Sequence, residues 1–131
     1  MKLVYVAGPY RASTPWGVEQ NIRRAEEAAV LVHRAGMFAV CPHANSRHME
    51  GVADDAHFLA GTMEMLRRCD AVLLIDGWKD SIGSCAEEVE AAHLGLPIFG
   101  RFDSSSAMLS LVRWREACDQ VEALRREHPL A

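Results

Sequence analysis

Residues 70–87 read DAVLLIDGWKDSIGSCAE, and this stretch decides the fold class. Its first part, residues 70–76, is a continuous apolar run with an aspartate at each end, which is typical of a strand that is buried on both faces. A polar, glycine-containing loop follows, and then a helix over about residues 84–94 that ends at Gly95. The stretch therefore predicts a strand, a loop and a helix in that order.

The same alternation of apolar strand and amphipathic helix extends along the rest of the chain. Strands are predicted at residues 3–7, 37–40 and 96–99, and amphipathic helices at about residues 18–35, 54–66 and 106–127. Such alternation implies a parallel sheet covered on both faces. We therefore predict an α/β, Rossmann-like (flavodoxin-like) three-layer sandwich with a mostly parallel sheet of four to five strands. One domain takes up residues 1–131, of which residues 106–131 form a C-terminal amphipathic helix.

Composition and charge narrow the class of protein. The chain has 131 residues, of which 14 are Lys or Arg and 18 are Asp or Glu, so its formal net charge is −4. This balance favours neither nucleic acid nor an anionic membrane as a partner. The apolar run at residues 3–7 is too short for a signal peptide or a membrane span. The four cysteines are widely spaced, without a CxxC pair, so we expect a reduced, cytoplasmic protein.

The strongest candidate site is the entrance to the helix after residues 70–76. In this fold, ligands bind beyond the carboxyl ends of the strands. Ser81, Gly83 and Ser84 can present backbone N–H groups to a phosphate, and Glu87 lies about one turn further along the helix. A structural interpretation stays open: Ser81 or Ser84 is an ordinary N-cap, and Ser84 with Glu87 matches a capping box. Cys85 is a weaker candidate, as a nucleophile at a helix start.

A second candidate segment, Gly8-Pro9-Tyr10-Arg11, follows the first strand directly. Glycine permits close backbone approach, Tyr10 can stack on a base, and Arg11 can pair with a phosphate. A plain turn with a surface arginine would show the same residues. The segment is not a GxGxxG motif, so we expect no dinucleotide cofactor.

A third candidate segment lies after the second strand, at Cys41-Pro42-His43-Ala44-Asn45. Cysteine and histidine are usual zinc ligands, but their spacing here fits no recurring zinc pattern. We therefore expect His43 and Asn45 to hydrogen-bond a ligand, with no metal. A zinc-dependent hydrolase that uses His43, His48 and acidic partners is the alternative.

These segments together resemble the nucleoside 2-deoxyribosyltransferase-like superfamily, which includes nucleotide N-glycosidases. The resemblance rests on the strand followed by Gly-Pro-Tyr-Arg at residues 4–11, on Pro42-His43, and on Gly77-Trp78-x-x-Ser81-x-Gly83-x-x-x-Glu87. It covers roughly residues 1–100 and leaves the last helix outside.

The resemblance implies a set of roles for these residues. Glu87 is then the nucleophile that attacks the anomeric carbon of a nucleotide, and Trp78 belongs to the ligand site. Ser81, Gly83 and Ser84 hold the 5′-phosphate. The transferases of the superfamily carry an aspartate in place of Ser81, which argues against plain transferase activity. Relatives often complete one another's pockets, so we also expect a homo-oligomer, either a dimer or a tetramer.

One position departs from the superfamily pattern. Its enzymes usually carry an aspartate, which acts as an acid or orienting group, eight residues before the aspartate that begins the third strand. Counting back from Asp70 gives Thr62. Asp55 lies two helical turns earlier on the same helix face, and it is a candidate substitute only if the helix is displaced. Two hypotheses follow. The protein is either a nucleoside 5′-monophosphate N-glycosidase-like hydrolase or a non-catalytic protein that binds or senses a nucleotide or nucleotide-sugar.

Overall fold

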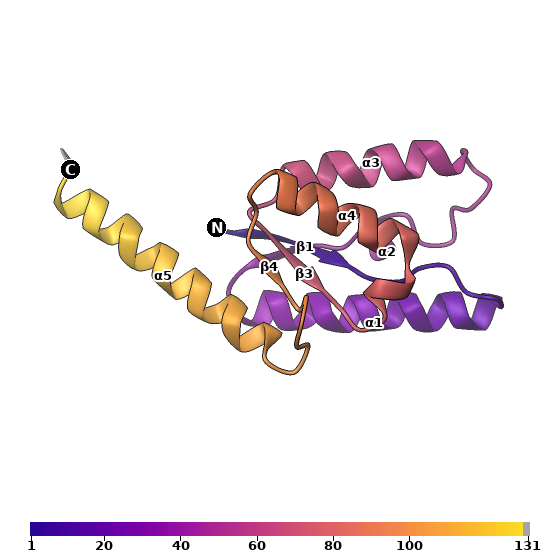
Figure 1. Cartoon of the computed structure of the whole chain (residues 1–131), viewed down its shortest axis with the longest axis horizontal. Coiled ribbons are helices and arrows are strands. Elements are labelled where there is room, and N and C mark those ends of the chain that lie inside the picture. The colour runs from indigo at the N-terminus through magenta and orange to yellow at the C-terminus, as the bar shows by residue number, and fades with distance from the viewer. Residues whose placement is uncertain (130–131) are drawn as a thin grey trace.

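The structure, a computed structural model, describes residues 1–129 (Figure 1). Strands and helices alternate along the chain. The elements are β1 (Leu3–Ala7), α1 (Pro15–Arg34), β2 (Phe38–Val40), α2 (Pro42–Asn45), α3 (Asp55–Arg67), β3 (Ala71–Leu74), a 3₁₀ turn η1 (Trp78–Asp80), α4 (Ile82–His93), β4 (Ile98–Phe99) and α5 (Ala107–Glu127).

The four strands form one parallel sheet in the order β2-β1-β3-β4. This confirms the predicted α/β, flavodoxin-like class and the lower of the two predicted strand numbers. The chain moves outward from β1 to β2 and then returns to place β3 on the other side of β1. The direction of winding therefore reverses between β1 and β3, and in such sheets this reversal opens a crevice at the carboxyl ends of the strands.

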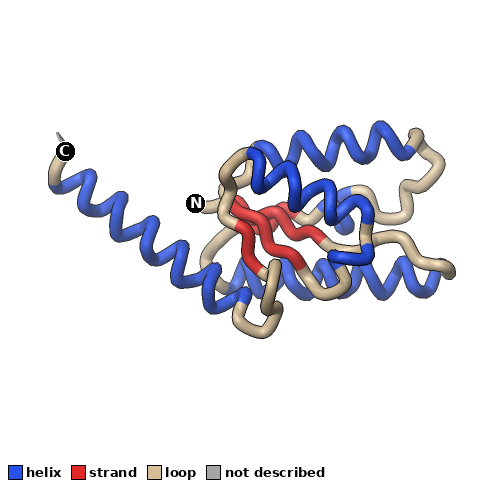
Figure 2. The backbone as a smooth tube through the Cα atoms, in the orientation of Figure 1, coloured by secondary structure: helices blue, strands red, loops and turns tan. Residues whose placement is uncertain are grey.

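Helices cover both faces of the sheet, which gives three layers (Figure 2). Alternation along β1 divides its side chains between the two faces, because successive residues of a strand point to opposite sides. Val4 and Val6 pack in the core beneath α1 and the start of α5. Tyr5 and Ala7 pack in the opposite core with Leu66 of α3 and with residues of β3 and α4. The second face is the one that carries the candidate site.

The local boundaries differ from the predictions at several loops. Pro42–Asn45, predicted as a loop, forms the short helix α2, which begins with proline at its first position. The helix that was predicted to start near Ser84 starts two residues earlier, because Ser81 is its N-cap. The Ser81 hydroxyl accepts a hydrogen bond from the Ser84 amide at 3.2 Å, so α4 begins at Ile82.

Helix α5 leaves the body of the molecule (Figure 1). Its first turns pack through Ala107 and Leu111, whereas every residue from 119 to 129 is exposed, including Val121 and Leu124. The predicted homo-oligomer, for which this apolar stripe is one candidate surface, stays a prediction. None of the helices within residues 1–129 is long and apolar enough to cross a membrane.

Candidate active site

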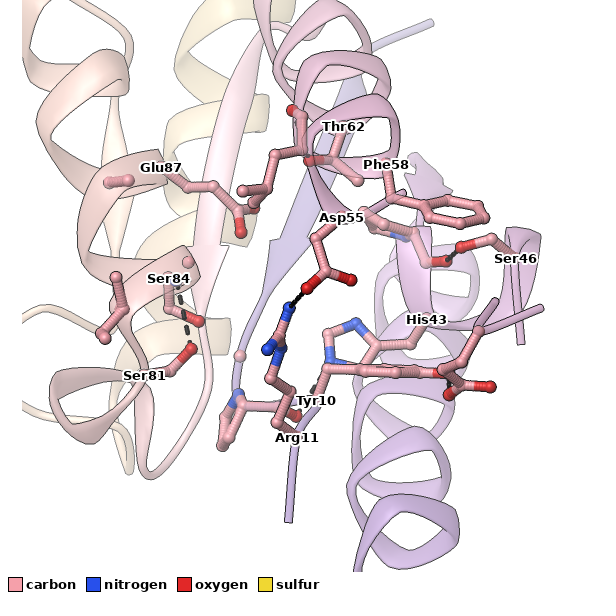
Figure 3. A pocket seen from close by; sticks show the side chains of 18 of the residues that line it. Tyr10, Arg11, His43, Ser46, Asp55, Phe58, Thr62, Ser81, Ser84 and Glu87 are labelled. Atoms are coloured by element: carbon pink, nitrogen blue, oxygen red, sulfur yellow. Dashed lines mark hydrogen bonds and ion pairs between the residues drawn. The ribbon is translucent and has the colours of Figure 1, made fainter. Parts of the chain in front are cut away.

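A cavity of about 790 Å³ opens at the carboxyl ends of β1 and β3 (Figure 3). Its walls come from the segment after β1, from α2 and the loop behind it, from α3, and from the start of α4. The lining side chains used below are Tyr5, Tyr10, Arg11, His43, Glu50, Asp55, Phe58, Thr62, Asp80, Ser84 and Glu87. The three predicted candidate segments thus meet at one place, although they lie up to 79 residues apart between Gly8 and Glu87.

Glu87 is the most perturbed acid of this cavity. Its carboxylate points from α4 into the cavity (Figure 3), and the Oε2 atom is buried with no hydrogen-bond partner among the described residues. Burial raises the pKa of Glu87 to about 7, and the nearby Tyr5 hydroxyl opposes part of that rise. At neutral pH the carboxyl group therefore exists in both its ionised and its protonated form.

Tyr5 is the main site residue that the sequence analysis missed. It is fully buried in β1, and its hydroxyl has no hydrogen-bond partner among the described residues. Burial raises the pKa of Tyr5, and the negative charge of Glu87 raises it further, so the phenol stays protonated. A signal was present in the sequence: a buried tyrosine hydroxyl requires a polar partner, yet the strand around it is apolar.

The two serines at the start of α4, Ser81 and Ser84, have different environments. Ser81 caps the helix, as the structural interpretation expected. Ser84 does not form the capping box with Glu87; its hydroxyl is buried without a partner among residues 1–129. The amides of Ile82 and Gly83 belong to the first helical turn, whose N–H groups have no acceptor inside the helix. A free hydroxyl and free amides therefore lie together at the positive end of a helix dipole.

Arg11 and Asp55 form an ion pair across the cavity (Figure 3). The guanidinium Nη2 and the carboxylate Oδ2 are 2.6 Å apart, and both side chains are about three-quarters exposed. The pair joins the segment after β1 to the first turn of α3. The sequence predicted separate roles for these two residues, whereas the structure places their side chains in contact with each other.

The segment after β1 is held in place by two buried polar side chains. Asn21 of α1 donates from Nδ2 to the carbonyl oxygens of Tyr10 and Arg11, at 3.0 and 3.2 Å. His43 Nε2 lies 2.9 Å from the Pro9 carbonyl, which can only accept, so this nitrogen carries the proton. Burial lowers the pKa of His43, so the ring is neutral, and its Nδ1 is buried without a partner among the described residues.

Two predicted ligand-binding residues do not line the cavity. Asn45 is exposed at the end of α2. Trp78 lines a separate cavity of about 260 Å³, together with Asp76 and Arg101. Sequence analysis missed Phe58 of α3, which lines the main cavity, and Glu50, which accepts a hydrogen bond from the Tyr10 hydroxyl.

The histidines of the third segment have separate partners. His48 Nε2 lies 2.8 Å from Glu19 Oε2 on α1, whereas His43 is bonded to the backbone as described. Within residues 1–129 no group of three or more His, Cys, Asp or Glu side chains is placed to hold a metal ion. The cysteines at positions 41, 69, 85 and 118 are all free thiols.

Comparison with known proteins assigns the chain to a family. A family model described as a domain of unknown function, DUF4406, matches residues 2–100. The chain belongs to the DUF4406 family. No match was found among curated proteins.

Two solved structures are similar in fold to this chain. A 2-deoxyribosyltransferase from Bacillus psychrosaccharolyticus superposes with a TM-score of 0.57 at 17% identity, over 73% of this chain and 69% of that enzyme. A 2-deoxyribosyltransferase from Leishmania mexicana superposes with a TM-score of 0.54 at 20% identity, over 76% of this chain and 63% of that enzyme. The chain therefore has a nucleoside 2-deoxyribosyltransferase-like fold, and it spans less than two thirds of the second enzyme.

Proposed function

We propose that this DUF4406 chain cleaves the N-glycosidic bond of a nucleoside 5′-monophosphate, with Glu87 as the nucleophile. The observation that carries the proposal is the buried carboxylate of Glu87, whose pKa is near 7, beside the Tyr5 hydroxyl at the mouth of a parallel sheet. Perturbed acids in clefts are typical of catalytic sites. The fold shared with two 2-deoxyribosyltransferases supports a reaction at the same kind of bond.

The proposed reaction has two steps. A Glu87 carboxylate oxygen attacks the anomeric carbon, and the base departs with the electron pair of the carbon–nitrogen bond. Water then hydrolyses the glycosyl ester and regenerates the carboxylate. The nearby Tyr5 hydroxyl lowers the pKa of Glu87 and so favours its ionised form at neutral pH.

The proposed substrate orientation follows from the polar and aromatic walls. The 5′-phosphate binds the free Ser84 hydroxyl and the amides of Ile82 and Gly83, since a helix N-terminus favours an anion. The base packs between Phe58 and the Tyr10 side of the cavity. Tyr10 and His43 already form an edge-to-face pair there, with ring centroids 5.5 Å apart.

A second candidate is a non-catalytic protein that binds a nucleotide or nucleotide-sugar. Thr62 favours it, because a threonine hydroxyl occupies the cavity wall at the position where the resemblance calls for an acid. A protein of this kind would keep the phosphate site and release no base.

The test is base release from a panel of nucleoside monophosphates, followed by chromatography. Glu87→Gln is expected to lower the rate by more than about a thousandfold, as for other nucleophiles. Glu90→Gln is the matched control, because Glu90 lies on the same helix and pairs with Arg67 outside the cavity. Release that persists in Glu87→Gln contradicts the proposal. Ligand-induced thermal stabilisation of the wild type without any release favours the second candidate.

A further inference from the structure

The charged side chains on the cavity wall are mostly acidic. Arg11 is the single Lys or Arg among the described lining residues, and its charge is already matched by Asp55. Glu50, Asp80 and Glu87 add further carboxyl groups. The charged side chains of the wall therefore carry an excess of negative charge, which attracts a cationic group of the ligand.

Glu87 serves as the nucleophile, and two of the remaining acids, Asp55 and Glu50, are engaged by neighbouring side chains. Asp55 contacts the Arg11 guanidinium at 2.6 Å, so its carboxylate is already paired. The hydrogen bond from Tyr10 lowers the pKa of Glu50. Burial and the neighbouring acid raise the pKa of each tyrosine hydroxyl, so neither phenol is a strong acid. Thr62 carries a hydroxyl, which is a weaker acid still.

The missing proton donor matters because of how a base departs. An uncharged purine or pyrimidine leaves as an anion unless a general acid protonates it, and such an acid is worth about 10²–10⁴-fold in rate. A base whose ring already carries a positive charge, shared by the glycosidic nitrogen, leaves as a neutral molecule. It needs no acid.

We propose that the substrate of this cavity is an N-glycoside whose base is cationic, such as a pyridinium or an N-alkylated purinium. This inference rests on the proposed nucleophile, Glu87. The acidic wall attracts the positive ring, and the faces of Tyr10 and Phe58 offer it cation–π contacts. The positive ring also favours the ionised form of Glu87, so binding of this substrate prepares the nucleophile.

The atoms and charges balance without a further reactant. The bond between the anomeric carbon and the cationic nitrogen breaks, and its electron pair neutralises the ring. A Glu87 oxygen bonds to the anomeric carbon as an ester. Water then adds its oxygen to that carbon, one proton passes to solvent, and the Glu87 carboxylate is regenerated. Each turnover thus releases one proton, whereas hydrolysis of an uncharged base releases none.

The test compares nicotinamide mononucleotide and nicotinamide riboside, as pyridinium probes, with the monophosphates of adenosine, guanosine and cytidine and their 2′-deoxy forms. Base release is followed by chromatography, and proton release by an indicator in weak buffer. We expect kcat/KM to be at least about a hundredfold higher for the pyridinium probes, with one proton released per nicotinamide.

A pair of substitutions tests the missing acid directly. Thr62→Asp is expected to raise kcat/KM for the uncharged bases by about tenfold or more, and the near-isosteric Thr62→Asn is expected not to. Wild-type cleavage of uncharged bases as fast as of the pyridinium probes, lost in Glu87→Gln, overturns this inference and leaves the proposed function intact. Absence of cleavage with every probe overturns the proposed function as well. The wild-type comparison decides the matter even where a Thr62 variant does not fold.

Discussion

Tyr5 of β1 and Glu87 of α4 bury their polar oxygens beside the same cavity, and neither the phenolic oxygen nor Glu87 Oε2 has a hydrogen-bond partner within residues 1–129. Burial without a partner is costly for such groups, so the fold keeps them at some expense in stability. Buried polar groups that destabilise the fold in this way are often found at functional sites.

Removing the Tyr5 hydroxyl is expected to shift the titration of Glu87. The hydroxyl lowers the pKa of Glu87, so Tyr5→Phe raises it, and the acid limb of the pH–rate profile moves to higher pH. Because the buried hydroxyl has no partner, the free energy of unfolding changes little. The measurement is kcat/KM from pH 5 to 9, with urea unfolding in parallel. An unshifted profile would show that the hydroxyl does not act on Glu87.

Glu87 is expected to make the fold less stable as pH rises. Its pKa is about 7 in the fold, against an ordinary value of 4.5, so the folded chain binds the extra proton between these values. The resulting loss of unfolding free energy is absent below pH 4.5 and complete above pH 7, where it amounts to up to about 3 kcal/mol. Glu87→Gln removes it.

Urea unfolding at pH 5 and pH 8 measures this effect. Glu87→Gln should be more stable than wild type at pH 8, and the gain should shrink at pH 5. The control is Glu116→Gln, at an exposed position of α5, where the difference from wild type should be small at both values. A gain from Glu87→Gln that is equal at both pH values contradicts the raised pKa.

The two serines of α4 are expected to separate capping from binding. Ser81→Ala removes the N-cap and costs about 1 kcal/mol of unfolding free energy. Ser84→Ala removes a buried hydroxyl without a partner, so it leaves stability nearly unchanged but weakens binding of 5′-phosphorylated ligands. Calorimetric titration with matched nucleoside and nucleoside monophosphate checks this. Equal loss of affinity for both ligands in Ser84→Ala would show that the 5′-phosphate does not bind at Ser84.

Asp55 is expected to act through Arg11 rather than as a proton donor. Both side chains are largely exposed, so Arg11→Ala and Asp55→Ala should each change the free energy of unfolding by less than about 1 kcal/mol. If Asp55 only holds Arg11 in place, the double variant loses no more kcat/KM than Arg11→Ala alone. A further loss in the double variant would give Asp55 a chemical role of its own.

The sequence predicted the fold well because its signals there are local. The apolar run of residues 71–75 and its glycine-containing loop fix a buried parallel strand and the helix behind it. The predicted helix boundaries were less accurate than the predicted elements where a single side chain decides the boundary. Ser81 and Ser84 are equally good caps by residue type, and only the structure shows that Ser81 forms the bond.

The lining of the cavity was predicted in part, because its contacts are long-range. Glu87, Ser84 and Arg11 carry their chemistry in their residue type and stand beside loops, so pattern analysis finds them. Tyr5 lies inside an apolar strand, and its role depends on a helix 82 residues further along the chain. The Arg11–Asp55 pair likewise depends on how α3 is placed against the segment after β1.

Intact-protein and peptide mass spectrometry of a rapidly quenched reaction with a cleaved substrate tests whether Glu87 is the nucleophile. We expect a glycosyl adduct on the peptide that contains Glu87, formed at the rate of the first base release and absent in Glu87→Gln. Base release by the wild type with the adduct on another residue, or undiminished release by Glu87→Gln, would contradict it.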